Sequence, residues 1–151
     1  LNNEYREFIG FKGIWRLPTE AEWEYVAKAG SSSRWSFGNK DSELDAHGWH
    51  AGNSGATTRE VGSKKANAWG FFDLHGLIQE MTSDSWKPSH KDHNGKQTPI
   101  ANVEDYCVAK GGSWFTESDS TRSSSRRRVH RKDRKDGVGF RLVWEPSKPL
   151  A

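Results

Sequence analysis

The clearest hydrophobic pattern along the chain is helical. Thr19 stands where the N-cap of a helix accepts a backbone hydrogen bond, and Glu22 follows three residues later, the spacing of a capping box. Gly30 supplies a C-terminal stop, so we expect a helix over residues 20–29. The apolar positions that share one face of this helix are Trp23, Val26 and Ala27. Helix capping and the helix dipole explain its clustered glutamates better than acid–base chemistry does.

Shorter patterns predict the other elements. Apolar runs typical of extended chain lie at residues 14–17, 106–109 and 137–144, the last as a single final strand. Residues 1–11 have the spacing of the end of an amphipathic helix. Two polar segments, residues 31–65 and 87–102, are expected to be loops.

The stretch Asn67–Gly76 encloses a run of aromatic residues, and we expect it at the centre of the domain. Gly70 suits a left-handed turn position, and Gly76 can close a turn without a Cβ clash. Asp73 stands where a buried turn needs a side-chain acceptor. The apolar residues are too closely spaced for one helical face, which predicts a short buried strand with Trp69 as a core ring.

The composition favours a compact, loop-rich domain. A chain of 151 residues suits one domain with one core. Only 32% of the residues are hydrophobic, but 15 are glycine and 8 are tryptophan, which favours a core built on large rings over a helical bundle. No apolar run approaches the length of a bilayer span and no signal-peptide pattern opens the sequence, so we expect a soluble protein and leave its compartment open.

The net charge of +3 conceals a basic C-terminal third. From Cys107 to the C-terminus, 11 Lys and Arg residues stand against 5 Asp and Glu. Cys107 is the single cysteine, which excludes an internal disulfide and any multi-cysteine metal site. The pairs His47–His50 and His90–His93 have a spacing that a metal can use, but an isolated pair is a weak signal and we expect surface histidines.

Four motifs stand in a fixed order: RLPTEAEWEY at residues 16–25, NAWGFFDLHG at 67–76, KGGSW at 110–114 and GFRLV at 139–143. Together they resemble the formylglycine-generating enzyme (sulfatase-modifying factor) family, over nearly the whole chain from Tyr5 to Val143. The resemblance implies a single α+β domain over residues 1–145, with little regular secondary structure and related to the C-type lectin fold, and a tail over 146–151. The family domain normally begins well before this point, so we expect its N-terminal portion to be absent from this sequence.

The resemblance also implies where the chemistry of the family would lie. Its enzymes oxidise a cysteine in a sulfatase peptide to formylglycine, using dioxygen and copper held by two cysteines that follow the GGS motif. Read onto this chain without gaps, those positions fall at Thr116 and Thr121. Threonine lacks the soft thiolate that Cu(I) requires, so we expect neither copper nor this oxidation. Cys107 precedes the motif and is expected to be a small apolar residue in a strand.

A calcium site of the family is altered as well. Where the family usually reads GN(V/A)WEW, this chain reads GLIQEM from Gly76 to Met81. Glu80 is kept and is a weak candidate ligand for calcium. Leu77 replaces the asparagine, and its side chain offers no oxygen to a cation that takes six to eight of them. Calcium at this position would therefore depend on backbone carbonyl groups.

The most charged segment spans residues 122–135. Arg122 and Arg126 match the R-S-x-x-R pattern that is usual in the family, so a structural role is expected for both. The basic residues in excess of that pattern are Arg127, Arg128, Arg131, Lys132, Arg134 and Lys135. Arginine can bind phosphate through its planar fork, but no aromatic residues are interleaved to stack on bases, so we prefer a surface loop with a bias for anions.

Candidate binding residues lie in the segment between Gly112 and Gly137, which is almost free of aliphatic residues. Such a segment buries little, so we expect it to be held at its two ends and to present side chains on a rigid scaffold. The candidates are Trp114, Phe115, Glu117, Asp119, Arg122, Arg127 and Arg128. The alternative, that Trp114 is buried core and the rest faces solvent without a ligand, is left open.

Three functions remain at this point. The first is a non-catalytic binding or accessory domain for an unidentified protein or small ligand, similar to the variable proteins of diversity-generating retroelements, which display ligand-binding residues between the same two landmarks. The second is a formylglycine-generating oxidase or another oxidase of the family. The third is a nucleic-acid or polyanion binder that uses the arginine-rich segment. The two threonines favour the first over the second, and salt-sensitive binding to DNA or heparin would favour the third.

Overall fold

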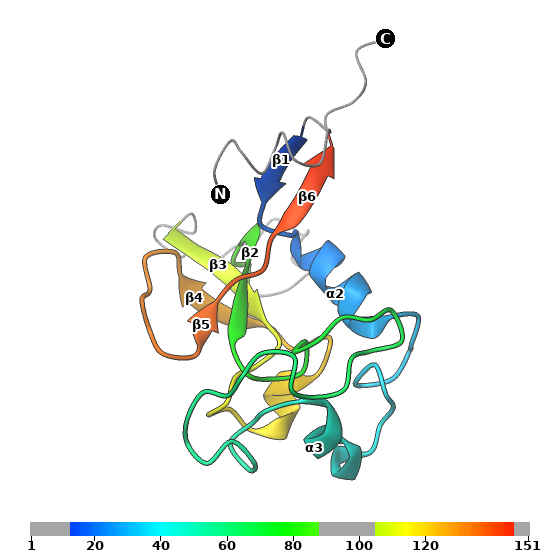
Figure 1. Ribbon diagram of the computed structural model, residues 1–151. Coiled ribbons are helices and arrows are strands. Elements are labelled where there is room, and N and C mark those ends of the chain that lie inside the picture. Colours follow the sequence, from blue (N-terminus) through cyan, green and yellow to red (C-terminus); the bar gives the residue numbers. More distant parts are fainter. Residues whose placement is uncertain (1–12, 88–104, 147–151) are drawn as a thin grey trace.

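A small mixed sheet with one long helix against it forms the centre of the fold (Figure 1). The computed structural model describes residues 13–87 and 105–146. The sheet has the strand order β4-β3-β2-β5, in which β5 runs parallel to β2 and the other pairs are antiparallel. Its strands are β2 (Gln79–Ser85), β3 (Tyr106–Lys110), β4 (Arg127–His130) and β5 (Val138–Gly139).

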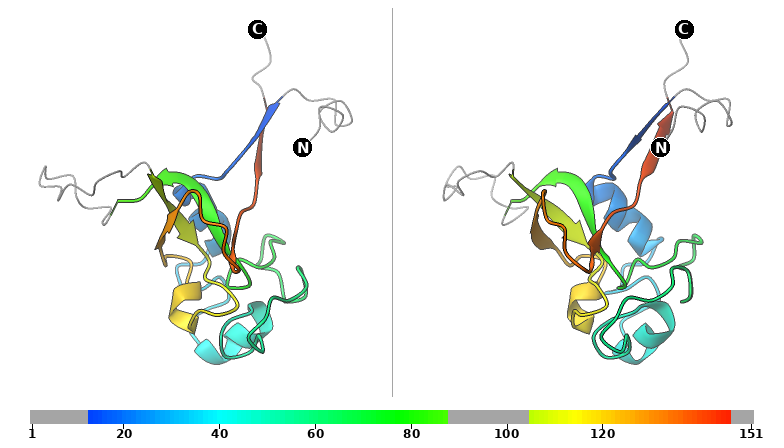
Figure 2. Two further views of the ribbon diagram at one scale, coloured as in Figure 1. Left: turned by 90° about the vertical axis from the view of Figure 1, so that its left-hand side faces the viewer. Right: turned by 60° about the vertical axis from the view of Figure 1, so that its left-hand side comes forward.

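Within the described ranges a second sheet has two strands, β1 (Gly13–Arg16) and β6 (Val143–Pro146), which pair antiparallel. Trp15 lies opposite Trp144, with their ring centroids 5.3 Å apart. In Figure 2 this ribbon extends away from the four-stranded sheet. The expected single strand over residues 137–144 is therefore wrong in its extent, because the chain leaves one sheet at β5 and enters the other at β6.

The helix α2 (Glu20–Lys28) is the predicted one, shorter by a single residue. Its capping box is confirmed, because the Glu22 amide donates to Thr19 Oγ1 at 3.2 Å and the Thr19 amide donates to Glu22 Oε2 at 2.8 Å. The helix ends before Ala29, which adopts a left-handed conformation with φ of 46°. The other helical pieces are short: η1 (Asp41–Glu43), α3 (Leu44–His47) and η3 (Ser118–Thr121).

Two apolar clusters lie on the two faces of β3. One joins α2 to the centre of the chain through Trp23, Ala27 and Leu74. The other consists of Cys107, Ala109 and Val129, with Met81 and Val138 packed against it. Side chains alternate along a strand, so Cys107 and Ala109 point away from the face that α2 covers. The expected role of Cys107 as a small apolar residue is confirmed, and burial raises the pKa of its thiol.

The interface between α2 and the sheet also contains a buried cation. The Lys110 ammonium has no exposed surface and lies 3.0 Å from Glu24 Oε2 and 3.7 Å from Glu20 Oε1. Arg126 binds Glu20 through two of its nitrogens, at 2.5 and 2.9 Å. Charged groups removed from water require such pairing, so this network constrains the position of α2 on the sheet.

The stretch Asn67–Gly76 forms no strand, and the prediction that its aromatic run is buried is wrong. Trp69, Phe71 and Phe72 are 43%, 41% and 44% exposed. The turn chemistry is confirmed, because Asp73 Oδ2 accepts a hydrogen bond from the Gly62 amide at 2.7 Å. The glycines are also required: Gly70 has φ of 82°, and a Cβ on Gly76 would lie 2.1 Å from the Trp49 carbonyl oxygen. The run is a tightly turned loop whose closing residues, not its rings, enter the core.

The architecture is the predicted α+β fold with few regular elements. The expected helix over residues 1–11 and most of the expected loop over residues 87–102 lie outside the described residues. No helix in the described ranges is long and apolar enough to cross a membrane.

Candidate ligand-binding site

A pocket of about 520 Å³ opens beside the sheet, between the start of β2, the end of β3 and the segment that runs from η3 into β4. Gln79, Gly111 and Gly112 line it from the first two elements. The third side contributes three arginines and three serines: Arg122, Arg126, Arg127, Ser120, Ser124 and Ser125. Its size suits a small molecule, and its walls are mostly polar.

The segment that forms the third side is held along its length, which corrects the expectation that only its ends are anchored. The Ser123 amide donates to the Arg34 carbonyl oxygen at 3.0 Å. Thr121 Oγ1 accepts a hydrogen bond from Trp35 Nε1 at 2.9 Å. Beyond this point β4 pairs with β3. Polar contacts therefore hold the segment where aliphatic burial cannot.

His75 is one of these anchors. It is buried, and its Nδ1 lies 3.0 Å from the Thr121 carbonyl oxygen, which can only accept a hydrogen bond. Nδ1 is therefore the protonated nitrogen, and Nε2 accepts from the Ser36 amide at 3.2 Å and lies 2.9 Å from its hydroxyl. Burial lowers the pKa of His75 to about 4, and nearby His47 adds to the effect. The neutral imidazole therefore connects the loop at Ser36 to the backbone at Thr121 by hydrogen bonds.

The glycines at the end of β3 let the chain turn closely over the same region. Gly111 and Gly112 have φ of 88° and 69°, which other residues rarely adopt. A Cβ on Gly112 would lie 2.9 Å from Thr116 Oγ1 and 3.0 Å from Thr121 Cγ2. The pocket wall is therefore backbone, and the two threonines lie directly behind it.

The charges around the pocket are unequally compensated. Arg126 is bound to Glu20, and Asp119 is paired with Arg34. Arg122 donates from Nε to the Asp119 carbonyl oxygen at 2.8 Å and lies 3.8 Å from its carboxylate. Arg127 is exposed, and its guanidinium makes no hydrogen bond or ion pair with a described residue. The pocket thus has a positive bias on the side of the segment 122–127.

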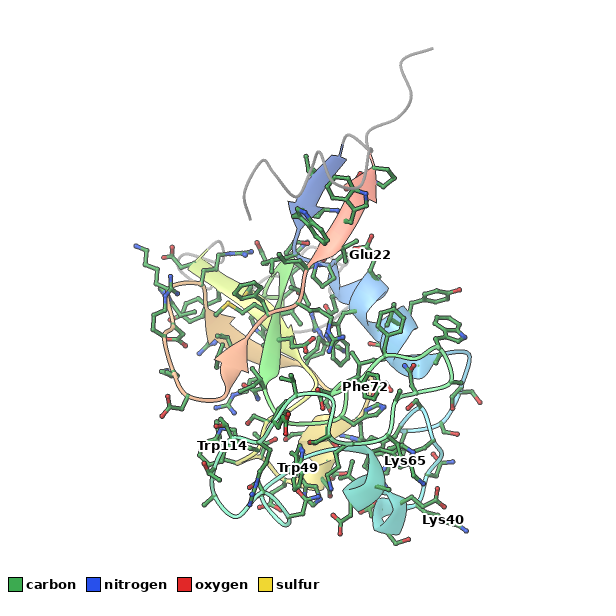
Figure 3. The ribbon with its side chains drawn as sticks, viewed as in Figure 1. Glu22, Lys40, Trp49, Lys65, Phe72 and Trp114 are labelled. Carbon is green, nitrogen blue, oxygen red and sulfur yellow. The ribbon has the colours of Figure 1, made fainter. Side chains whose placement is uncertain are left out.

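The structure brings together three of the seven candidate binding residues. Asp119, Arg122 and Arg127 line the pocket, whereas Trp114, Phe115, Glu117 and Arg128 do not. Trp114 and Phe115 pack edge to face with centroids 5.0 Å apart, and Figure 3 places Trp114 among the long loops, far from β1 and β6. Arg128 lies over the Tyr106 ring, 4.9 Å from its centroid.

Sequence reasoning missed four polar residues of the pocket lining: Gln79, Ser120, Ser124 and Ser125. Gln79 stands between Ile78 and Glu80 in a mostly apolar run, and a carboxamide in such a run is the signal that could have identified it. Ser120, Ser124 and Ser125 carry no comparable signal, because serine is common in any surface segment. Only the pairing of β2 with β3 and β5 brings Gln79 beside them.

The two threonine hydroxyls are occupied by internal hydrogen bonds. Thr116 Oγ1 accepts from the Ser113 amide at 2.8 Å and lies 3.1 Å from the Ser113 carbonyl oxygen, to which it donates. Thr121 Oγ1 donates to the Ser118 carbonyl oxygen at 2.7 Å, in addition to accepting from Trp35. Both residues are buried. These positions stabilise the turn and η3.

Glu80 is also fully engaged. Its two carboxylate oxygens accept hydrogen bonds from Arg141, at 2.5 Å from Nε and 2.7 Å from Nη2. Oε2 also accepts from Trp23 Nε1 at 2.6 Å. A calcium ion bound here would have to displace the Arg141 guanidinium. Among the described residues, no group of three or more His, Cys, Asp or Glu side chains could hold a metal ion.

The histidine pair in the described part of the chain is divided between different partners. His47 stacks on Phe37 with ring centroids 4.2 Å apart, and its Nδ1 lies 3.0 Å from the Glu43 carbonyl oxygen. His50 Nε2 lies 2.9 Å from Asp45 Oδ1. The second pair, His90–His93, lies outside the described residues.

A second hollow, of about 700 Å³, is apolar. Exposed rings of Phe71, Phe72 and Phe140 line it together with Val61. Its charged lining residues are Asp73, Glu80 and Arg141. It shares no lining residue with the polar pocket, and β2 contributes Gln79 to the polar pocket and Glu80 to this hollow.

Residues 3–146 match the family model described as the sulfatase-modifying factor enzyme 1-like domain. The chain belongs to this family. The formylglycine-generating enzyme of Mycobacterium tuberculosis is 36% identical over 87 residues, which are 50% of this chain and 29% of that protein. The mouse protein named inactive C-alpha-formylglycine-generating enzyme 2 is 24% identical over 162 residues, covering 97% of this chain and 48% of the relative.

Two solved structures show the same fold of the formylglycine-generating enzyme family. Treponema denticola variable protein 1 superposes with a TM-score of 0.73 and 35% identity over 85% of this chain. PvdO from Pseudomonas aeruginosa superposes with a TM-score of 0.76 and 27% identity over 94% of this chain. The chain spans 46% and 56% of these two proteins, so it corresponds to about half of each.

Membership of the formylglycine-generating enzyme family gives the two threonines their significance. At the positions expected for the copper-binding cysteines, this chain has hydroxyl groups that are already hydrogen-bonded to backbone and to Trp35. Cys107 is buried in β3 and does not replace them. Thr116 and Thr121 do not fit Cu(I), which requires soft thiolate ligands.

Proposed function

We propose that this chain is a non-catalytic binding module of the formylglycine-generating enzyme family, and that its ligand occupies the polar pocket beside β2. The observation that carries the proposal is that the hydroxyl groups of Thr116 and Thr121 are both used in hydrogen bonds within the fold. Both hydroxyls serve the local fold, while the glycine turn in front of them still forms the wall of an open pocket. These contacts support a scaffold that is kept while the positions expected for copper ligands serve the fold.

Two relatives support this assignment. One is named as an inactive member of the family and aligns with 97% of this chain. The other is a Treponema variable protein that shares the fold at 35% identity. Neither name identifies a ligand, so the pocket itself has to supply the chemistry.

The main alternative is oxidation of a sulfatase cysteine, and it has a direct test. The purified chain is incubated with a sulfatase-type cysteine peptide, Cu(I) and dioxygen, and the peptide mass is followed. We expect no change in mass, because two threonines cannot hold Cu(I). Conversion of the peptide cysteine to the aldehyde would refute the proposal.

The binding function is tested by nuclear magnetic resonance on ¹⁵N-labelled protein titrated with mixtures of small polar metabolites. We expect shift changes in the backbone amides of Gly111, Gly112, Ser124 and Arg127, all of which line the pocket. Shift changes confined to the apolar hollow around Phe72 would place the site on the other side of β2. Absence of localised changes with every mixture would count against a small-ligand module.

The polyanion alternative is less well supported by the contacts of the basic residues. Arg131 donates to the Ser83 carbonyl oxygen, Arg134 to the Asp133 carbonyl oxygen, and Lys135 is paired with Asp133. These cationic side chains therefore already make hydrogen bonds or ion pairs within the protein. Heparin or DNA binding that weakens steeply as salt is raised would instead support this alternative.

A further inference from the structure

We infer that the ligand of the polar pocket is a small organic anion, with a carboxylate or phosphate group bound by Arg122 and Arg127 and with polar atoms bound by Gln79. This inference rests on the proposed binding function and names the class of ligand. It is carried by two independent observations, one on a buried amide and one on charge.

The buried amide is the side chain of Gln79 at the start of β2. Gln79 is only 3% exposed, and it lines the pocket. Its backbone amide donates to the Gly137 carbonyl oxygen at 2.8 Å, but its side-chain carboxamide makes no hydrogen bond with a described residue. It is also not among the buried polar atoms that are sealed from solvent, so its remaining surface opens into the pocket.

An unpaired amide in a buried position destabilises a fold, since a primary amide can donate two hydrogen bonds and accept two. Nearly all buried polar groups in proteins have partners. A leucine or methionine would fill the same space on β2 at no such cost. Because the carboxamide of Gln79 opens into the pocket and has no partner among the described residues, a polar ligand bound there can complete its hydrogen bonds.

The charge of the pocket gives the sign of that ligand. Of its three arginines, Arg126 is neutralised by Glu20, whereas Arg127 has no carboxylate partner among the described residues. The single acidic residue of the lining, Asp119, is shared between Arg34 and Arg122. A guanidinium binds carboxylate and phosphate through two parallel hydrogen bonds, so the positive side of the pocket favours an oxyanion.

The remaining walls limit the size and polarity of the ligand. The pocket volume of about 520 Å³ lies in the range for metabolites, well below that needed for a folded partner. Ser120, Ser124 and Trp86 also line the pocket. The Arg126 guanidinium lies over the Trp86 ring, 4.9 Å from its centroid. A small polar anion fits these walls better than an apolar ligand does.

The test uses succinate, inorganic phosphate and neutral succinamide as probes of the ¹⁵N-labelled chain. We expect succinate or phosphate to shift the Gln79 side-chain amide and the Gly112 backbone amide at concentrations up to about 20 mM, and succinamide to bind about tenfold more weakly or not at all.

Matched variants separate a built site from general attraction by positive charge. Gln79→Met keeps the volume of the side chain and removes the amide, and Arg127→Gln removes one pocket charge; each should weaken anion binding about tenfold. Arg134→Gln removes the same charge from an exposed position outside the pocket and should leave the affinity unchanged. Thermal melting confirms that each variant is folded.

Three outcomes would overturn the inference. Equal weakening by Arg127→Gln and Arg134→Gln would mean that only net charge attracts the anions. Unchanged affinity of the Gln79→Met variant for the anions would show that the Gln79 amide does not bind the ligand. Pocket shifts with succinamide and other neutral probes, but with no anion, would refute the anionic ligand while leaving the binding module intact; absence of pocket shifts with every probe, charged or neutral, would count against both.

Discussion

Trp23 and Trp69 are both tryptophans within family motifs, yet the fold uses them differently. Trp23 is 1% exposed, and its Nε1 donates to Glu80 Oε2 at 2.6 Å, so it joins the apolar cluster to a buried ion pair. Trp69 is 43% exposed and packs on the exposed ring of Tyr25, with centroids 4.9 Å apart. The contribution of a tryptophan ring to the free energy of unfolding depends on its burial. The motif alone does not show whether the ring is buried.

We therefore expect Trp23→Ala and Trp69→Ala to differ clearly in the free energy of unfolding. Trp23→Ala removes a buried ring and leaves the Glu80–Arg141 pair with one donor fewer, so it should cost about 3–5 kcal/mol. Trp69→Ala should cost about 1 kcal/mol, because only partial burial and one ring contact are lost. Urea denaturation measures both, and a larger loss at Trp69 would contradict the placement of this loop.

His75 makes stability depend on pH. Its pKa is about 4 in the folded chain against an ordinary value of 6.5, so between these values the unfolded chain binds a proton that the folded chain does not. The stabilising effect is complete above pH 6.5 and is lost as the pH falls toward 4, by about 3 kcal/mol in all.

His75→Gln removes this proton uptake, so its unfolding free energy should change less between pH 7 and pH 5 than that of the wild type. Parallel curves for the two proteins would show that His75 is not the titrating group, and a His47→Gln variant controls for the histidine that lies near it.

At the scale of elements, α2 and the sheet are joined by a charged interface as well as by the ring of Trp23. Lys110 projects from β3 toward Glu20 and Glu24 of the helix, and burial lowers the pKa of its ammonium, against the two carboxylates that raise it. Glu24 has a second partner in Lys28, at 2.8 Å on the exposed side. Glu24 thus has an inner cation, Lys110, and an outer one, Lys28, and of these two only Lys110 is fully removed from water.

The two lysines make a matched pair for mutation. Lys110→Met leaves Glu24 with the exposed Lys28 and removes one cation from Glu20, which keeps Arg126. Breaking a buried pair in this way should cost about 3 kcal/mol. Lys28→Met removes an exposed partner of the same Glu24 and should cost less than about 1 kcal/mol. Denaturant midpoints of the two variants give the comparison. Equal losses would mean that the buried network contributes no more than a surface pair.

At the scale of the whole molecule, the fold consists of a body and a ribbon. The body contains the four-stranded sheet, α2 and the loops, and the β1–β6 ribbon extends from it (Figure 2). Arg16 connects the two parts, because it binds Glu22 of the helix at 2.7 Å and Glu145 of β6 at 2.5 Å. A two-stranded ribbon is marginally stable by itself, so these contacts and the Trp15–Trp144 pair have to hold it.

Trp144→Ala should therefore open the ribbon while the body stays folded. The change removes the ring that faces Trp15, and the strand pairing loses its main cross-strand contact. Amide hydrogen exchange should accelerate in β1 and β6 and remain slow in β2 and β3. If exchange accelerated equally in β3, the ribbon and the body would form one cooperative unit.

The sequence by itself determined the family and the helix with its capping box, because each depends on neighbouring residues or on a fixed motif order. It also predicted threonines at the positions expected for the copper ligands of the family. It also located the turn at Asp73 through the glycines on either side. The tertiary structure decided which aromatic rings are buried, where β5 and β6 divide, and that Gln79 faces Arg122 and Arg127 across a pocket. Burial and side-chain pairing depend on strands that are far apart in the chain, and the local pattern around a residue carries no record of which distant strand will lie beside it.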